Sequence, residues 1–415
     1  MKILFLTPPV WNQNIPFNAI RPIAPAMLNA GFAELGHDSI FIDSNALRWG
    51  WNKIGEALKE MDPDVVAFTS LYNNRFASEN LTSFIKVNFS GKKIISGGPF
   101  ATTNPESLLK WGVDTVCVGE GDLVLEEVLA QKGIIKGKMV EDLDSLPYPL
   151  YDSCMPEETY YAGCGPRWEY PEGWLLITRG CRHKCTFCSN PLFSGKATRF
   201  MGPDRVYTEL TMLKDRGIKH IYLYSDELVG SSITDDKRLE EICAKVAPLG
   251  LTYKTQGRCS KDISSSTLEA MVSAGFKSVG WGIESFSPKV LKAMRKSIDL
   301  EDVYHTLRLA KKAGLFNWLF IMVGGFEEEV EDFEMTRKQI LALKKENLID
   351  GAQISIMALE PGAPGWQKAV DNGWIQETEF QYSHFEPTLN VPWASKEEII
   401  RRQNILGQII YGTGE

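Results

Sequence analysis

Three cysteines stand close together in the segment RGCRHKCTFCSN, at residues 179–190. Cys181, Cys185 and Cys188 have the spacing C-x3-C-x2-C, so their thiols fall within one short loop. Thiolates grouped in this way bind transition metals. A structural zinc site usually takes four ligands from two C-x2-C pairs far apart in sequence, and no second pair follows here. His183 is too near its neighbours to complete a relaxed tetrahedron, so we expect it to face solvent.

An iron-sulfur cluster offers another use for three thiolates. A [4Fe–4S] cluster normally takes one cysteine at each iron, so three cysteines leave one iron free to bind a small molecule. The remaining cysteines are scattered along the chain, where we expect small, partly buried side chains: Cys117, Cys154, Cys164, Cys243 and Cys259. The sequence therefore predicts a catalytic cluster in this loop, and a structural zinc site remains the alternative.

The composition is that of an ordinary globular protein. Its 415 residues exceed the length of about 250–300 at which one core stops growing, so we expect two domains. Lys+Arg 45 against Asp+Glu 53 gives a net charge of −8, without a dense basic run, which argues against a nucleic-acid partner. The N-terminal run MKILFLTPPVW is too short for a signal peptide, and no stretch approaches a membrane span. We therefore expect a cytoplasmic protein with no membrane partner.

Short apolar runs alternate with helical patterns over residues 1–145, which predicts a Rossmann-like parallel sheet with helices on both faces. Ligands of such sheets bind beyond the carboxyl ends of the strands. The first domain is therefore expected to hold a ligand. The expected strands are 3–6, 39–42, 65–69, 93–96 and 115–118.

The alternation stops at residues 146–172, whose prolines and acids predict a linker at the surface. Six strand-helix units follow in residues 173–375, which predicts a partial (β/α)6 TIM-type barrel with its chemistry at the carboxyl ends of the strands. Residues 376–415 are expected to form a short tail, with a docked helix that starts at the capping pattern of Ser395 and Glu398. The expected barrel strands are 175–178, 221–224, 253–256, 278–283, 318–323 and 353–358.

The barrel segment resembles the radical S-adenosylmethionine (radical SAM) superfamily. The cysteine loop has that family's spacing and follows the first expected barrel strand. IYLYSDEL, TQGRCS and SVGWGIESF are similar to the family's second, third and fourth strands, and FIMVGGFEEEV and IMALEPGAPGWQ to its fifth and sixth. The order of these segments matches the family over most of the barrel. GGFEEEV differs in lacking the proline that the family often has after strand five.

The resemblance implies a reaction and a set of site residues. In that family the free iron chelates the amino and carboxylate groups of SAM, and one electron from the cluster cleaves SAM to a deoxyadenosyl radical. Carried over to this sequence, Cys181, Cys185 and Cys188 would hold the cluster. The residues that would contact SAM are Phe187, Asp226, Gln256, Arg258, Glu284, Ser285, Gly324, Gly325 and Met357.

The first domain resembles the cobalamin-binding domain that precedes the barrel in one large subgroup. ISGGPFATTNPESLL and VDTVCVGEGDLVLEEVL carry the likeness, and DLDSLPYP resembles the usual linker. The Asp-x-His-x-x-Gly loop that supplies a cobalt ligand in other proteins is absent, so Tyr72 or Leu71 would lie beneath the cobalamin; a domain that has lost this ligand is the alternative. The implied cobalamin contacts are Pro8, Thr69, Ser70, Leu71, Tyr72, Gly97, Gly98, Pro99, Gly119, Glu120 and Gly121.

The resemblances imply a cobalamin-dependent radical SAM methyltransferase that methylates an unactivated carbon of a small-molecule or peptide substrate. One SAM would methylate cobalamin, a second would give the radical, and flavodoxin or ferredoxin would supply the electron. A second hypothesis keeps the cofactors but ends in rearrangement, cyclisation or ring contraction. The catalytic hydrogen-atom donors would be Tyr160, Tyr161, Cys154 or Cys164. A third hypothesis is a cobalamin-binding sensor or carrier with a structural zinc site.

Overall fold

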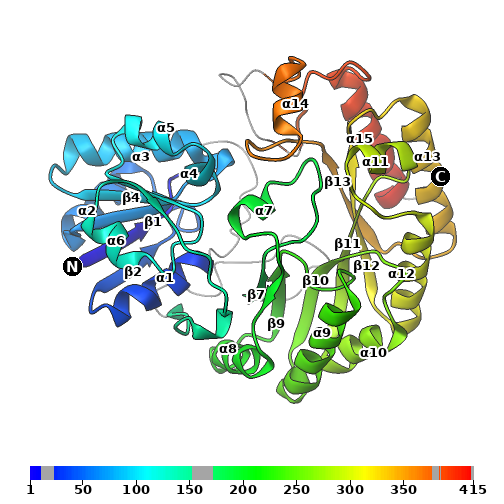
Figure 1. Cartoon of the computed structure of the whole chain (residues 1–415), viewed down its shortest axis with the longest axis horizontal. Coiled ribbons are helices and arrows are strands. Elements are labelled where there is room, and N and C mark those ends of the chain that lie inside the picture. The colour runs from blue at the N-terminus through cyan, green and yellow to red at the C-terminus, as the bar shows by residue number, and fades with distance from the viewer. Residues whose placement is uncertain (11–22, 152–171, 376–382, 384, 413–415) are drawn as a thin grey trace.

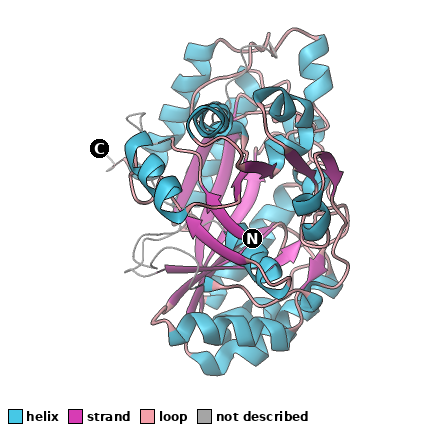
Figure 2. Cartoon of the chain, turned by 90° about the vertical axis from the view of Figure 1, so that its left-hand side faces the viewer, coloured by secondary structure: helices cyan, strands magenta, loops and turns pink. Residues whose placement is uncertain are grey.

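The computed structural model describes residues 1–10, 23–151, 172–375, 383 and 385–412. Two α/β lobes follow one another along the chain, the first drawn in blue and cyan and the second in green to red (Figure 1). In the side view the strands lie inside and the helices surround them (Figure 2). This is the α/β architecture predicted from the sequence.

The first lobe is built on a six-stranded sheet with the order β2-β1-β3-β4-β5-β6, in which every pair is parallel. The Rossmann-like sheet is confirmed, with one strand more than expected, because the four residues of β6 give little signal in sequence. The strands are β1 (Lys2–Leu6), β2 (Asp38–Ile42), β3 (Val65–Thr69), β4 (Lys93–Gly97), β5 (Thr115–Val118) and β6 (Gly133–Lys136). The helices are α1 (Ile23–Glu34), α2 (Trp51–Met61), α3 (Arg75–Asn88), α4 (Pro99–Thr103), α5 (Pro105–Trp111) and α6 (Leu125–Ala130), with short 3-10 turns at Tyr72–Asn74 (η1) and Leu143–Ser145 (η2).

The second lobe is an open barrel of six parallel strands, to which β8 adds an antiparallel edge. The sheet order is β13-β12-β11-β10-β9-β7-β8, as the strand-helix alternation predicts apart from β8. The strands are β7 (Glu172–Arg179), β8 (Arg199–Phe200), β9 (His220–Ser225), β10 (Thr252–Arg258), β11 (Phe276–Glu284), β12 (Phe316–Val323) and β13 (Gly351–Ile356). The helices are α7 (Asn190–Phe193), α8 (Pro203–Asp215), α9 (Ile233–Val246), α10 (Ser265–Ala274), α11 (Pro288–Ala293), α12 (Leu300–Ala313), α13 (Val330–Lys345), α14 (Trp366–Asp371) and α15 (Lys396–Tyr411), with a 3-10 turn at Ala247–Leu249 (η5).

The core of the barrel reaches across the boundary between the lobes. Met27 of α1 is buried in the same apolar cluster as the barrel strands. Leu146 and Tyr151 are also buried there, 6% and 5% exposed, whereas Tyr148 and Leu150 between them are 45% and 40% exposed. The described start of residues 146–172 therefore runs along the surface and inserts two side chains into the core. Apolar side chains at the junction pack under the barrel because burial removes them from water.

The C-terminal helix α15 docks on the barrel beside β13, as the capping pattern predicts. Ser395 caps it, with Oγ accepting from the Glu398 amide at 3.2 Å. Arg402 is fully buried, and its guanidinium donates to the Glu328 carboxylate at 2.8 Å, in the turn after β12. This contact links the last helix to the turn at the carboxyl end of β12.

Candidate active site

The cysteine loop leaves the carboxyl end of β7 through Gly180. Gly180 has φ 92°, and an added Cβ would lie 2.1 Å from the carbonyl oxygen of Ala197, so only glycine fits. Its amide donates to Asp226 Oδ2 at 2.7 Å, and the next amide, of Cys181, donates to the Gly195 carbonyl at 3.1 Å. Asp226 thus anchors the start of the loop to the end of β9. The position at a strand end is the one that the sequence predicts.

A carboxylate that the sequence reasoning missed, Glu227, contacts the first thiol. Cys181 Sγ lies 3.3 Å from one of its oxygens, and His183 Nε2 lies 2.7 Å from the other. The expectation that His183 faces solvent is wrong, since its side chain is only 23% exposed and pairs with Glu227. Burial opposes ionisation of Glu227, yet His183 and the neighbouring donors hold its pKa below the usual value. The sequence signal that could have identified Glu227 is its place directly after Asp226 in the SDE segment at the end of β9.

The rest of the loop is tied to three distant parts of the barrel. The Thr186 amide donates to the Met294 carbonyl at 2.9 Å, after α11, and the Thr186 carbonyl accepts from the Gly365 amide at 2.7 Å, before α14. Ser189 hydrogen-bonds to Glu360, after β13. These contacts hold all three cysteines on one framework at the mouth of the barrel.

The three thiols suit a cluster in their chemistry. Cys181, Cys185 and Cys188 are free and partly buried. Burial and the charge of Glu227 raise the pKa of Cys181 to about 12, and burial raises that of Cys188 to about 11, so a metal has to displace their protons. Within the described ranges, no three His, Cys, Asp or Glu side chains are arranged to hold a single metal ion. A cluster binds its thiolates at separate irons, so they need not converge on one point.

Two buried polar groups at neighbouring strand ends fit the polar atoms of SAM. Ser225 is the last residue of β9 and Arg258 is the last residue of β10. The Ser225 Oγ and Arg258 Nη2 atoms are buried and have no hydrogen-bond partner among the described residues. A buried donor without a partner is costly, so these groups favour a polar ligand. Gln256 is already engaged, donating to the Ser225 carbonyl at 2.8 Å and accepting from Tyr222 at 3.0 Å. Sequence reasoning selected Arg258 and Gln256 but missed Ser225.

The G-x-E-S segment turns sharply at the end of β11. Glu284 has φ 70°, a left-handed conformation that costs a side-chain-bearing residue of order 1–3 kcal/mol. Its carboxylate pairs with the buried Lys296 at 2.9 Å. Ser285 is 1% exposed and its hydroxyl contacts Thr336 of α13 at 3.3 Å, so this side chain points into the protein. Glu284 is therefore held by Lys296, whereas Ser285 is turned toward α13.

The remaining SAM candidates are packed against protein. Phe187 is partly buried against the barrel core, and Met357 is 1% exposed at the end of β13. The Cβ positions of Gly324 and Gly325 face Ile399 at 3.1 Å and Met294 at 2.4 Å. Side chains therefore occupy the space beside both glycines.

In the first lobe, the candidate residues gather at the carboxyl ends of β1, β3, β4 and β5. Ser70 is buried and its hydroxyl contacts Ser96 at 3.0 Å. Leu71 is 36% exposed, whereas Tyr72 is 2% exposed and its hydroxyl donates to the Pro361 carbonyl of the second lobe at 3.0 Å. Of the two residues expected beneath cobalamin, Leu71 has the more accessible side chain.

The glycines of the first lobe differ in what lies beside them. Gly98 has φ 98°, and its Cβ would lie 2.6 Å from Thr69 Cγ2, so this turn requires glycine before Pro99 starts α4. Gly119 has φ 87° and nothing within 4 Å of its Cβ position, which leaves room for a ligand. Gly97 and Gly121 face Cys117, and the Pro8 carbonyl accepts from Asn45 Nδ2 at 2.9 Å.

Glu120 belongs to an ion-pair network between the lobes. Its carboxylate binds Arg199 of β8, and Arg179, the last residue of β7, lies 3.6 Å away. Arg179 binds Asp122 through two hydrogen bonds of 2.8 and 3.1 Å. All four side chains are at most 12% exposed. We call these four residues the interlobe network; only Glu120 was selected from sequence, as a cobalamin contact.

The hydrogen-donor candidates Tyr160, Tyr161, Cys154 and Cys164 lie outside the described residues. No described helix is both long and apolar enough to cross a bilayer.

Comparisons with known proteins identify both domains. Residues 175–340 match the radical SAM superfamily, and residues 18–129 match the B12 binding domain. An uncharacterized methyltransferase of Pyrococcus horikoshii is 27% identical in an alignment 427 residues long, gaps included, that covers 96% of this chain and 90% of that protein. The cytidylyl-2-hydroxyethylphosphonate methyltransferase of Streptomyces wedmorensis is 24% identical over 68% of this chain and 62% of its own length.

A solved structure shares the fold over most of the chain. The radical SAM methyltransferase TsrM from Kitasatospora setae, with tryptophan substrate and a SAM analog bound, has a TM-score of 0.71 at 17% identity and covers 90% of this chain and 77% of its own. The radical SAM domain implies a [4Fe–4S] cluster and SAM, and the B12-binding domain implies cobalamin. The free thiols, the orphaned Ser225 and Arg258 and the space at Gly119 fit these groups. The chain therefore carries a B12-binding domain joined to a radical SAM domain, the pair of domains that the sequence motifs predict.

Proposed function

We propose that the enzyme transfers a methyl group to an unactivated carbon of a small-molecule or peptide substrate. When bound, the cluster and SAM supply a deoxyadenosyl radical that removes hydrogen, and cobalamin supplies the methyl group. The relatives described above are named methyltransferases, which supports this reaction over others.

One observation carries the proposal: the interlobe network joins the two cofactor domains next to the cysteine loop. Arg179 is bound to Asp122, just beyond β5, and lies two residues before Cys181. The open space at Gly119 is three residues before Asp122. A methyl donor in the first lobe and a radical source in the second have to reach the same carbon, and errors of about 1 Å in such placement cost about 100-fold in rate. The network holds the carboxyl ends of β5 and β7 next to each other.

The residues of the barrel mouth bind and orient in this scheme. Arg258 and Ser225 offer buried donors to a SAM carboxylate, and Asp226 holds the cysteine loop through the Gly180 amide. Lys296 balances the Glu284 carboxylate inside the barrel. Burial of these groups excludes water, which a radical reaction requires of its site.

Mass spectrometry of the product tests the proposal. The protein is reconstituted without oxygen with iron, sulfide and cobalamin, and given SAM, a reductant and candidate substrates drawn from its genomic neighbourhood. We expect deoxyadenosine together with a substrate heavier by one methyl group. A product of unchanged composition, formed with deoxyadenosine, would favour the rearrangement, cyclisation or ring-contraction hypothesis. Zinc in place of iron and sulfide would favour the sensor or carrier.

Further expectations remain predictions. They are a cytoplasmic location, an electron donor such as flavodoxin or ferredoxin, and hydrogen-atom donation by the tyrosines and cysteines of residues 154–164. The domain limits 1–145, 146–172, 173–375 and 376–415 are likewise proposals.

A further inference from the structure

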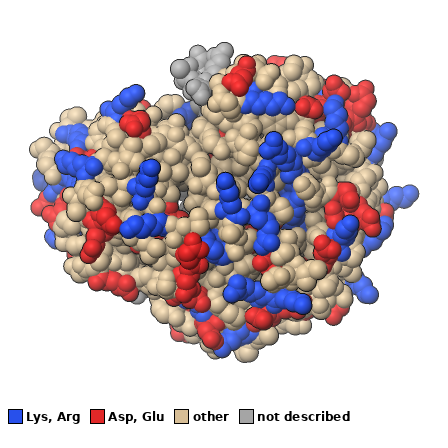
Figure 3. All heavy atoms as spheres, viewed as in Figure 1, with Lys and Arg blue, Asp and Glu red and all other residues tan. Residues whose placement is uncertain are grey.

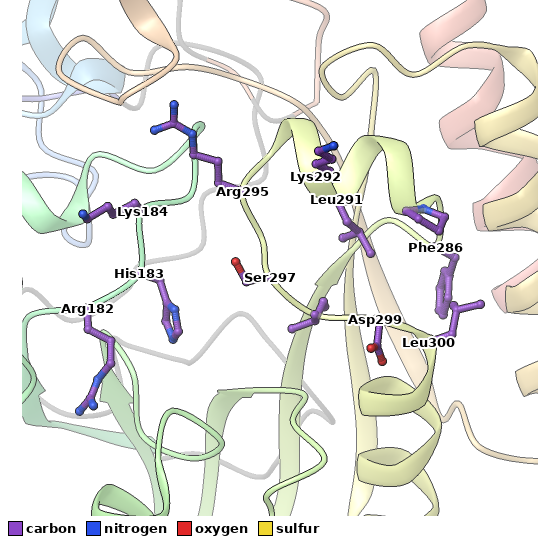
Figure 4. A pocket seen from close by; sticks show the side chains of 12 residues that line it. Arg182, His183, Lys184, Phe286, Leu291, Lys292, Arg295, Ser297, Asp299 and Leu300 are labelled. Atoms are coloured by element: carbon purple, nitrogen blue, oxygen red, sulfur yellow. The ribbon is translucent and has the colours of Figure 1, made fainter.

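A hollow of about 640 Å³ opens on the surface beside the cysteine loop. One wall is the loop between the first two cysteines, and the other is α11 with the turn that follows it (Figure 4). Phe286, Leu291 and Ile298 form apolar parts of the lining. Exposed cationic side chains surround it: Arg182, Lys184, Lys292 and Arg295. We call this feature the basic hollow.

The positive charge of the basic hollow is largely uncompensated. Arg182 pairs with Asp235, but among the ion pairs of the described chain none includes Lys184, Lys292 or Arg295. One carboxylate, Asp299, lines the hollow and caps α12. The chain as a whole carries a net charge of −8, so a local excess of cations stands out. On the face of the molecule that Figure 1 also views, Lys and Arg side chains gather near the middle (Figure 3).

One wall of the basic hollow is part of the cysteine loop, and the other is hydrogen-bonded to it. Lys184 is the residue before Cys185, and Arg182 follows Cys181. On the opposite wall, the Met294 carbonyl, one residue before Arg295, accepts from the Thr186 amide at 2.9 Å. A molecule seated in the hollow is therefore separated from the thiols by little more than this loop.

We propose that the basic hollow docks a small acidic one-electron carrier protein, which reduces the cluster there. One electron leaves the reduced carrier and enters the oxidised cluster, so the carrier is oxidised and the cluster reduced by one electron. The inference rests on the proposed function, because a radical SAM cluster needs an electron for each cleavage of SAM. It goes further in assigning the residues and the charge of the partner.

The character of the hollow favours a protein over a small anion. Sites for phosphate gather several buried donors on one point, often from backbone amides. Here the cations are exposed, come from separate segments and are interspersed with apolar side chains. Exposed complementary charges speed association, by about 10-fold to 1000-fold at low salt, and electron-transfer complexes use small, transient interfaces.

The test compares two reductants on the reconstituted enzyme. The first variant, Lys184→Glu with Lys292→Glu, reverses two exposed charges of the basic hollow. The matched control, Lys219→Glu with Lys277→Glu, reverses two exposed charges near the amino ends of β9 and β11, at the end of the barrel away from the cysteine loop. The rate of bleaching of the cluster absorbance is measured with reduced flavodoxin and with dithionite. At low salt we expect the first variant to lose at least about tenfold in the flavodoxin rate. Reduction by dithionite, which is a small anion, should slow much less than reduction by flavodoxin, and the control variant should be unchanged with both reductants. The loss with flavodoxin should shrink in 1 M salt, where charges are screened beyond about 3 Å.

Three results would overturn the inference. Flavodoxin rates equal in the first variant and the unmodified enzyme would show that docking occurs elsewhere. An equal loss with dithionite would trace the defect to the cluster itself. Competition by inorganic phosphate at constant ionic strength, abolished in the first variant, would assign the hollow to a small anion. None of these depends on methyl transfer, so failure of the proposed function would be seen separately as a missing methylated product.

Discussion

Removing Arg179 from the interlobe network should weaken the contact between the lobes measurably. Arg179→Met keeps the apolar stem of the side chain but leaves Asp122 without its two hydrogen bonds of 2.8 and 3.1 Å. Breaking a buried pair by removing one partner costs about 3–5 kcal/mol. Because Asp122 retains 12% of its side-chain exposure, we expect the lower end, about 3 kcal/mol.

The expected shift in melting temperature follows from the size of the chain. Unfolding entropy is about 2.1 cal/mol/K per residue near 60 °C, so 415 residues give about 0.9 kcal/mol/K. A loss of about 3 kcal/mol then lowers Tm by about 3 °C. Calorimetry of the anaerobically purified protein measures this shift, and small-angle scattering reports whether the lobes separate before they unfold.

A matched control removes an exposed ion pair inside the first lobe. Lys86 lies 2.8 Å from Asp114 and is 40% exposed, so Lys86→Met should cost less than about 1 kcal/mol. Adding Asp122→Leu to Arg179→Met should restore part of the lost stability, because the unpaired carboxylate is then gone. Equal Tm values for Arg179→Met and Lys86→Met would refute the reasoning, as would a double variant less stable than the single one.

Three further predictions follow from single residues. Cys188→Ala should lower the iron and sulfide bound per chain after reconstitution, and an unchanged iron content would contradict a cluster held by three thiolates. Burial raises the pKa of Glu328 from 4.5 to about 7 despite Arg402, so the folded state holds a proton that the unfolded state releases. The free energy of unfolding should therefore fall as pH rises from about 4.5 to 7. Urea unfolding at several pH values measures this slope, and Glu328→Gln should remove the part that Glu328 contributes. Gly98→Ala should cost about 2–3 kcal/mol from backbone strain and the contact with Thr69, and a urea midpoint equal to that of the unmodified protein would contradict it.

Much of the fold could be predicted from local patterns. Buried parallel strands such as β3 and β12 are apolar along their length, and the helices between them have regular apolar spacing, so the alternation is visible in one dimension. β6 and β8 were missed because four and two residues are too few to show a period. Their pairing depends on neighbours that only the folded sheet supplies.

The site was predictable only as far as sequence fixes position along a strand. The cysteine loop lies at the end of β7 because its residues directly follow that strand. The contact of His183 with Glu227 and that of Glu120 with Arg199 join residues far apart in sequence, and no periodicity encodes them. The left-handed turn at Glu284 redirects Ser285 toward α13, which alternation along a strand does not anticipate.

The interlobe network also constrains how genes for such proteins can be recombined. Arg179 and Arg199 belong to the barrel, but their carboxylate partners belong to the other lobe, and Met27 completes the barrel core from the same side. A barrel expressed alone would lose the acidic partners of both arginines and would expose the apolar face that Met27 covers, and an exposed apolar face favours aggregation. Exchange of the first lobe between relatives would therefore succeed only when both acids after β5 are inherited along with the new lobe.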